Sequence, residues 1–227
     1  MPTRLVAPLL AALAVLLVAG LALLVTNHVT DPIDVALIRA VRDPALVAPL
    51  AWLRQLTELG STIAMTILAI VLLLAELLAR RPRTGIAAAA TIGLAALVNE
   101  LTKGLIERTR PDVIQPIVTE HGFSFPSGHA GLSTVGYGIA ALLVARSGAP
   151  WGVKVAAVVA AGCLVALIGI SRVYLGAHFP SDVAAGWLAG GAVVLLFAWL
   201  SPGSRAPAYA PAAEDRAEPR SDLPGTG

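Results

Sequence analysis

Six long apolar stretches alternate with short polar connections along the chain, at residues 5–25, 61–79, 85–106, 130–145, 153–170 and 183–200. About 20 helical residues cross a hydrocarbon core about 30 Å thick, so each stretch suits one membrane-spanning helix. The fourth stretch is the shortest, and we expect its helix to begin at Ser127. Ala and Gly recur within these runs and let neighbouring helices approach closely. The pattern therefore predicts an all-α fold, an integral membrane bundle of six transmembrane helices.

Two segments depart from this pattern. Residues 26–60 mix charged and apolar positions, which is typical of one or two amphipathic helices at the membrane interface, although an ordered polar loop fits equally well. Residues 201–227 hold five prolines and seven charged residues without any apolar run. Such a segment buries too little apolar surface to fold. We therefore expect a membrane domain at residues 1–200 and a disordered tail at residues 201–227.

The composition agrees with a bilayer environment. Hydrophobic residues make up 57% of the chain and charged residues 13%, and the mean hydropathy is +0.80. A soluble domain has about 25% charged residues. The basic residues are scattered over short loops and the net charge is only +2, so we expect no nucleic-acid partner. The single cysteine, Cys163, lies in an apolar run, where we expect it to pack as a small side chain.

The distribution of arginine predicts the orientation in the membrane. Six spans place both termini and the second and fourth loops on one side. The second loop carries Arg80, Arg81 and Arg83 between two spans, and short arginine-rich loops stay in the cytoplasm. We therefore expect a multi-pass protein of the cell membrane whose termini are both cytoplasmic.

Polar clusters interrupt the chain at three places, all on the predicted outer side. The first ends the third apolar stretch, where Lys103 and Arg110 are seven residues apart and Pro111 follows. In a helix this spacing puts two cations on one face, two turns apart, and the proline then ends the helix. Two such cations suit a phosphate ligand. Alternatively, Lys103 forms salt bridges with Glu100 and Glu107, which lie three and four residues away.

The second cluster, Pro126-Ser127-Gly128-His129, opens the fourth apolar stretch. Serine is a good N-cap, and a helix N-terminus offers free N–H groups to an anion. Gly128 would let the backbone approach such an anion closely. The alternative is an ordinary helix cap followed by an interfacial histidine.

The third cluster joins the last two apolar stretches and contains Ser171, Arg172, His178 and Asp182. The forked guanidinium of Arg172 suits phosphate oxygens. Asp182 is four residues from His178, near enough to accept from one ring nitrogen and leave the other nitrogen nucleophilic. An interfacial His–Asp cap without catalytic function fits the same spacing.

Taken together, the clusters indicate phosphoryl transfer. Three basic side chains, two histidines and an orienting carboxylate are what this reaction needs when no metal is present. The sequence shows no acidic cluster typical of a magnesium site, so we expect no metal and no other cofactor. The motifs Lys103-x6-Arg110-Pro111, Pro126-Ser127-Gly128-His129 and Ser171-Arg172-x5-His178-x3-Asp182 resemble the three-part signature of the type 2 phosphatidic acid phosphatase superfamily.

The resemblance implies a role for each matching position. His178 would be the nucleophile that forms a phosphohistidine, Asp182 would orient it, and His129 would protonate the leaving group. The phosphate would be held by the remaining residues of the signature, Lys103, Arg110, Ser127, Gly128 and Arg172.

The resemblance also implies a substrate class, a lipid phosphate or pyrophosphate such as a phosphatidate, phosphatidylglycerol phosphate or polyprenyl pyrophosphate. The superfamily includes vanadium haloperoxidases, but these are soluble, and six lipid-length spans disfavour them here. A different class of function stays open at this point, a non-catalytic membrane protein that binds anionic lipid headgroups through the same clusters.

Overall fold

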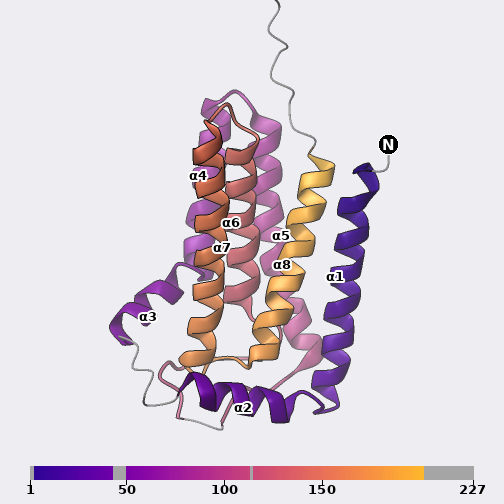
Figure 1. Cartoon of the computed structure of the whole chain (residues 1–227), viewed down its shortest axis with the longest axis vertical. Helices are drawn as coiled ribbons and strands as arrows, with labels where there is room; N and C mark the ends of the chain where they lie inside the picture. Colours follow the sequence, from indigo (N-terminus) through magenta and orange to yellow (C-terminus); the bar gives the residue numbers. More distant parts are fainter. Residues whose placement is uncertain (1–2, 43–49, 113–114, 202–227) are drawn as a thin grey trace, which may run out of the picture.

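The computed structural model describes residues 3–42, 50–112 and 115–201, and these form eight helices and no strand (Figure 1). The helices are α1 (Thr3–Thr26), α2 (Asp31–Val41), α3 (Leu50–Glu58), α4 (Thr62–Leu78), α5 (Pro82–Ile106), α6 (Gly128–Ala145), α7 (Trp151–Tyr174) and α8 (Pro180–Leu200). The all-α prediction is confirmed. Residues 202–227, which make up nearly all of the predicted tail, lie outside the described residues.

Each of the six predicted apolar stretches corresponds to one helix, to within one residue at either end of α4. Within the described residues, α1, α5, α6, α7 and α8 are long and apolar enough to cross a bilayer. The shorter α4 forms a bent pair with α3, with 50° between them, and together they supply a sixth candidate span. Large apolar side chains cover the outside of these helices. Leu78 and Leu105, for example, are 87% and 81% exposed. This surface suits lipid, so the chain is a multi-pass membrane protein.

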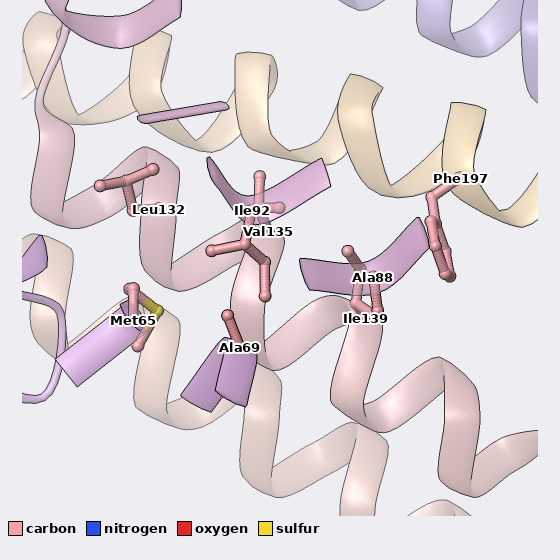
Figure 2. Close-up of a cluster of buried hydrophobic side chains, with 8 residues drawn as sticks. All are labelled: Met65, Ala69, Ala88, Ile92, Leu132, Val135, Ile139 and Phe197. Carbon is pink, nitrogen blue, oxygen red and sulfur yellow. The ribbon is translucent and has the colours of Figure 1, made fainter. Parts of the chain in front are cut away.

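Helix α6 occupies the centre of the bundle and packs on α4, α5, α7 and α8. The main hydrophobic cluster, shown in Figure 2, joins α6 to α4, α5 and α8 through Met65, Ala69, Ala88, Ile92, Leu132, Val135, Ile139 and Phe197. Cys163 differs from our expectation, because its side chain is exposed on α7 and does not pack between helices.

Small residues bring α6 and α8 into close contact. A Cβ atom added at Gly190 would lie 2.6 Å from the carbonyl oxygen of Gly131 and 2.6 Å from Thr134 Cβ. At Gly186 it would lie 2.7 Å from the carbonyl oxygen of Ser127. Next to this crossing, the backbone N–H of Ser127 donates to the carbonyl oxygen of Asp182 at 3.0 Å. The close packing therefore fixes the second polar cluster against the third.

The segment at residues 26–60 contains two helices, α2 and α3, in agreement with the helical alternative. Helix α2 lies across one end of the bundle, below the ends of α7 and α8 in Figure 1. Its buried residues are Asp34 and Ile38. Ile38 packs in a cluster with Ala130, Val173 and Val183, which come from the three helices that carry the second and third polar clusters.

The first polar cluster differs from the prediction. Helix α5 ends at Ile106, because Glu107 adopts the left-handed conformation with φ 52° and its N–H closes the last turn on the carbonyl oxygen of Lys103. Arg110 and Pro111 follow outside the helix, so the prediction that Lys103 and Arg110 share one helix face is wrong. The physical reason is tertiary, since Arg110 makes hydrogen bonds to carbonyl groups far along the chain that a helical position would not reach.

Candidate active site

The three polar clusters meet at one end of the bundle, the end that α2 crosses in Figure 1. The end of α5, the start of α6 and the turn between α7 and α8 supply them. Hydrogen bonds tie the connections together: Ser124 N–H donates to the carbonyl oxygen of Arg108 at 2.8 Å, and Ile117 N–H donates to that of Leu175 at 2.9 Å.

His178 is the centre of this arrangement. Its side chain is 2% exposed, and its Nε2 lies 3.3 Å from Nη1 of Arg110. On the other side of the ring, Nδ1 lies 3.6 Å from Oδ2 of Asp182. Burial lowers the pKa of His178 below its ordinary value of 6.5, although the carboxylate of Asp182 opposes this shift. The imidazole is therefore neutral at pH 7, with one nitrogen toward a carboxylate and the other toward an arginine.

Arg110 joins the loop before α6 to the turn before α8. Its Nη1 donates to the carbonyl oxygen of Ala177 at 2.8 Å, and its Nε donates to that of Gly122 at 3.1 Å. Its Nη2 donates to the carbonyl oxygen of His121 at 3.0 Å, so this histidine contributes a backbone group to the site. Three hydrogen bonds to backbone carbonyls thus hold the guanidinium beside His178.

Arg172 is the most buried cation of the site, with 1% of its side chain exposed. Its Nη1 donates to Thr57 Oγ1 at 3.2 Å, and its Nη2 forms an ion pair with Glu120. Its Nε is buried and has no hydrogen-bond partner among the described residues. Arg172 therefore keeps one donor available for an additional acceptor.

Glu120 was not predicted as a site residue, and its carboxylate covers Arg172. Burial raises the pKa of Glu120, but the charge and hydrogen bond of Arg172, with the charge of Arg110, outweigh this and lower it overall. The carboxylate is therefore ionised and lies among the same cationic side chains that a phosphate group would need.

Lys103 and the start of α6 lie together. Ser127 caps α6, with its Oγ accepting from Ala130 N–H at 3.5 Å. A Cβ atom added at Gly128 would lie 3.7 Å from Lys103 Nζ and 3.0 Å from Asn99 Nδ2, so the glycine leaves room for both side chains. Lys103 also pairs with Glu100 at 2.9 Å, which is one of the two salt bridges that the sequence allowed.

Asp182 has hydrogen-bond partners besides His178, which is the partner that the sequence predicts. Its Oδ1 accepts from Arg108 Nη1 at 2.6 Å, and its Oδ2 accepts from Phe179 N–H at 2.9 Å and from Ser124 Oγ. Arg108 in turn contacts Asp34 at 2.8 Å. Arg108 and Ser124 were missed because they are 74 and 58 residues from Asp182 in sequence, and no local spacing relates them to it. Among the described residues, no group of three or more His, Cys, Asp or Glu side chains is placed to hold a metal ion.

The comparisons with known proteins agree with the motifs. The model of the PAP2 superfamily matches residues 84–206. Phosphatidylglycerophosphatase B of Bacillus subtilis is 34% identical over 164 residues, which cover 70% of this chain and 78% of that protein. Decaprenylphosphoryl-5-phosphoribose phosphatase of Mycobacterium tuberculosis is 37% identical over 167 residues, covering 70% of this chain and 86% of the relative.

A solved structure shows the same architecture. The transmembrane PAP2-type phosphatidylglycerolphosphate phosphatase of Bacillus subtilis superposes with a TM-score of 0.77 and 29% sequence identity, covering 84% of this chain and 95% of that protein. The match extends beyond the motif region to most of the helical bundle. With the three clusters gathered at one end of that bundle, this chain belongs to the PAP2 superfamily and is a phosphoric ester hydrolase of that family.

Proposed function

We propose that the protein is a metal-independent lipid phosphatase that works through a phosphohistidine intermediate at His178. The observation that carries this proposal is the placement of a buried, neutral histidine between a carboxylate and an arginine. Asp182 would hold the proton on Nδ1, which would leave the lone pair on Nε2, the nitrogen that faces Arg110. Arg110 and Arg172, with Lys103, would neutralise the phosphate oxygens.

The proposed reaction has two steps. In the first, His178 Nε2 attacks phosphorus, an N–P bond forms, and the bond from phosphorus to the lipid oxygen breaks as His129 gives that oxygen a proton. In the second, His129 takes a proton from water, the water oxygen attacks phosphorus, and the N–P bond breaks. Inorganic phosphate and a neutral histidine result, and His129 is again protonated.

An apolar groove supports a lipid as the substrate. It has a volume of about 560 Å³ and is lined by α1, α5, α6 and α8. Along α5 its lining residues run from Ala87 to Thr102, which is about 22 Å at about 1.5 Å per residue. At its polar end lie Asn99, Thr102 and Pro126, the immediate neighbours of Gly128, Lys103 and Ser127. An acyl or prenyl chain in this groove would therefore present its phosphate to the clusters.

The relatives suggest two headgroup classes for the proposed activity. One of them is named for phosphatidylglycerophosphate and another for a decaprenyl-linked phosphoribose. We propose that this protein acts on a lipid phosphate or pyrophosphate of the phosphatidate, phosphatidylglycerol phosphate or polyprenyl class, on the outer face of the membrane. Phosphate release from a panel of these lipids by the detergent-purified protein tests the proposal.

The same assay tests metal independence. We expect activity to persist in excess EDTA and orthovanadate to inhibit it, because vanadate adopts the five-coordinate geometry of the transferring phosphoryl group. Loss of activity on chelation, with recovery on addition of magnesium, would contradict the metal-free mechanism. Binding of lipid phosphates without any phosphate release would instead indicate a non-catalytic headgroup-binding protein.

A further inference from the structure

A cluster of buried polar side chains lies behind the His178–Asp182 pair. We call it the Arg108 cluster, and it consists of Asp34, Arg108, Ser181 and Asp182. Arg108 bridges two carboxylates, with Nη1 2.6 Å from Asp182 Oδ1 and Nη2 2.8 Å from Asp34 Oδ2. The side chains of Asp34, Arg108 and Asp182 are 2%, 8% and 0% exposed. Arg108 occupies one of the unspecified positions of the first motif, and Asp34 lies outside all three motifs.

Arg108 is held from several sides. Its guanidinium carbon lies 4.0 Å from the centre of the Phe179 ring, which suits a cation–π contact. Its Nη1 also donates to Ser181 Oγ at 2.7 Å. Burial would lower the pKa of Arg108, but Asp182 and Asp34 raise it overall, so the charge is retained. A third carboxylate, that of Asp31, lies 3.3 Å from Nη2, so the cation has one fixed position among Asp182, Asp34 and Asp31.

Asp34 connects α2 to the first turn of α8. Its Oδ1 accepts from the backbone N–H of Ser181 at 2.9 Å, and its Oδ2 accepts from Ser181 Oγ at 2.5 Å. The N–H groups of a first helical turn have no partner within the helix, so Asp34 satisfies one of them from outside. The neighbouring residue in α8 is Asp182, and α2 thus fixes the backbone that carries the catalytic carboxylate.

These contacts leave Asp182 in a single orientation. Arg108 binds Oδ1, and Phe179 N–H and Ser124 Oγ bind Oδ2. The carboxylate cannot rotate without breaking these bonds, and Oδ2 is the oxygen that faces His178 Nδ1. The orientation of the imidazole, and with it the direction of Nε2, therefore depends on the partners of Asp182 as well as on Asp182 itself.

We propose that Arg108 and Asp34 are positioning residues, which act through Asp182 to aim the imidazole of His178 at phosphorus. Helix α2 then contributes to catalysis, although it precedes the region 84–206 that the family model matches. The inference rests on the proposed function of His178 as the nucleophile.

Kinetics of Arg108→Gln and Asp34→Asn test the proposal, with Arg39→Ala as the control on the exposed face of α2. We expect Arg108→Gln to lower kcat about 100-fold, the loss expected when a reacting group is displaced by about 1 Å, and Asp34→Asn to lower it about 10-fold. KM should change by less than about twofold, because neither side chain belongs to the set that we propose binds phosphate. Acid-labile phosphate trapped on the enzyme should form more slowly in both variants, and Arg39→Ala should match the wild type.

A double-variant experiment separates positioning from general stability. If Arg108 acts through Asp182, then Arg108→Gln should add no further loss of kcat to Asp182→Asn. Multiplied losses in the double variant would overturn the proposal, as would wild-type kcat in both Arg108→Gln and Asp34→Asn. If Arg108→Gln unfolds in detergent, two milder variants replace it: Asp34→Asn, which keeps the side-chain shape, and Arg108→Lys, which keeps the charge. The same outcomes for kcat then support or overturn the proposal. A wild-type protein without phosphatase activity would instead contradict the proposed function.

Discussion

The two histidines of the site have different surroundings. His178 is buried between Asp182 and Arg110, and its pKa is lowered by burial. His129 opens α6, where no carboxylate is near it in sequence and the charge of Glu120 reaches it across the site. The first surroundings suit a nucleophile whose tautomer is fixed, and the second suit a group that exchanges protons with substrate and water.

This difference predicts how substitutions separate the two roles. His178→Ala should abolish activity on both a lipid monoester and p-nitrophenyl phosphate, because no covalent intermediate can form. His129→Ala should lose most activity on the lipid and keep a larger share on p-nitrophenyl phosphate, whose leaving group departs without a proton. Acid-labile phosphate on the wild type, and its absence from His178→Ala, provides the second readout. Activity of His178→Ala on the activated ester, together with its loss in His129→Ala, would exchange the roles.

The ion pair between Glu120 and Arg172 predicts a competition with substrate. The carboxylate of Glu120 pairs with Arg172, which we propose binds phosphate. The phosphate group of the substrate must therefore displace this carboxylate when it binds. Glu120→Gln should therefore lower KM and the vanadate inhibition constant roughly 5-fold, which corresponds to about 1 kcal/mol for a partly exposed ion pair. Glu58→Gln on the exposed face of α3 is the matched control. An increased KM in Glu120→Gln would show that Glu120 supports binding instead.

At the scale of helices, the crossing of α6 and α8 sets the distance between the second and third clusters. Gly190 and Gly191 are adjacent in α8, but only Gly190 faces α6 closely, and nothing lies within 4 Å of a Cβ atom added at Gly191. Gly190→Ala should lower both the unfolding temperature in detergent and kcat, because α6 and α8 must separate. Gly191→Ala should keep activity and gain up to about 1 kcal/mol from helix propensity. Equal effects of the two substitutions would argue against this account of the packing.

The helices of the six apolar stretches could be predicted from the sequence, whereas the environment of the Asp182 carboxylate could not. Apolar length determines where spans occur, and Ser127 marked the start of α6 because capping is a local property. The sequence predicted that the third spanning helix ends at Pro111, whereas α5 ends at Ile106. The left-handed conformation of Glu107, which ends it, is not indicated by the pattern of apolar residues. The pairing of Arg108 with Asp34 depends on how α2 folds across the bundle, which no spacing within one segment encodes.

For the whole molecule, sidedness is the main prediction. The clusters should lie outside and the turn with Arg80, Arg81 and Arg83 should lie in the cytoplasm. In a variant without Cys163, a cysteine at Gln115 should react with a membrane-impermeant thiol reagent on intact cells, and a cysteine at Thr84 should not. Permeabilised cells should label both positions and serve as the control. The reverse pattern on intact cells would place the site on the cytoplasmic leaflet. The division into a membrane domain at 1–200 and a disordered tail at 201–227 also stays a prediction.

The groove along α5 has a kinetic consequence for how the enzyme meets its substrate. Its lining includes Leu94, Val98 and Leu200, which are 60%, 51% and 68% exposed on the lipid-facing surface of the bundle. The proposed lipid substrate would therefore enter sideways, by lateral diffusion within one leaflet, without leaving the hydrocarbon. The rate then depends on the mole fraction of substrate within the membrane or micelle. Added inert lipid or detergent should therefore slow the enzyme by surface dilution, although the bulk concentration of substrate stays constant. Water-soluble p-nitrophenyl phosphate should escape this dilution.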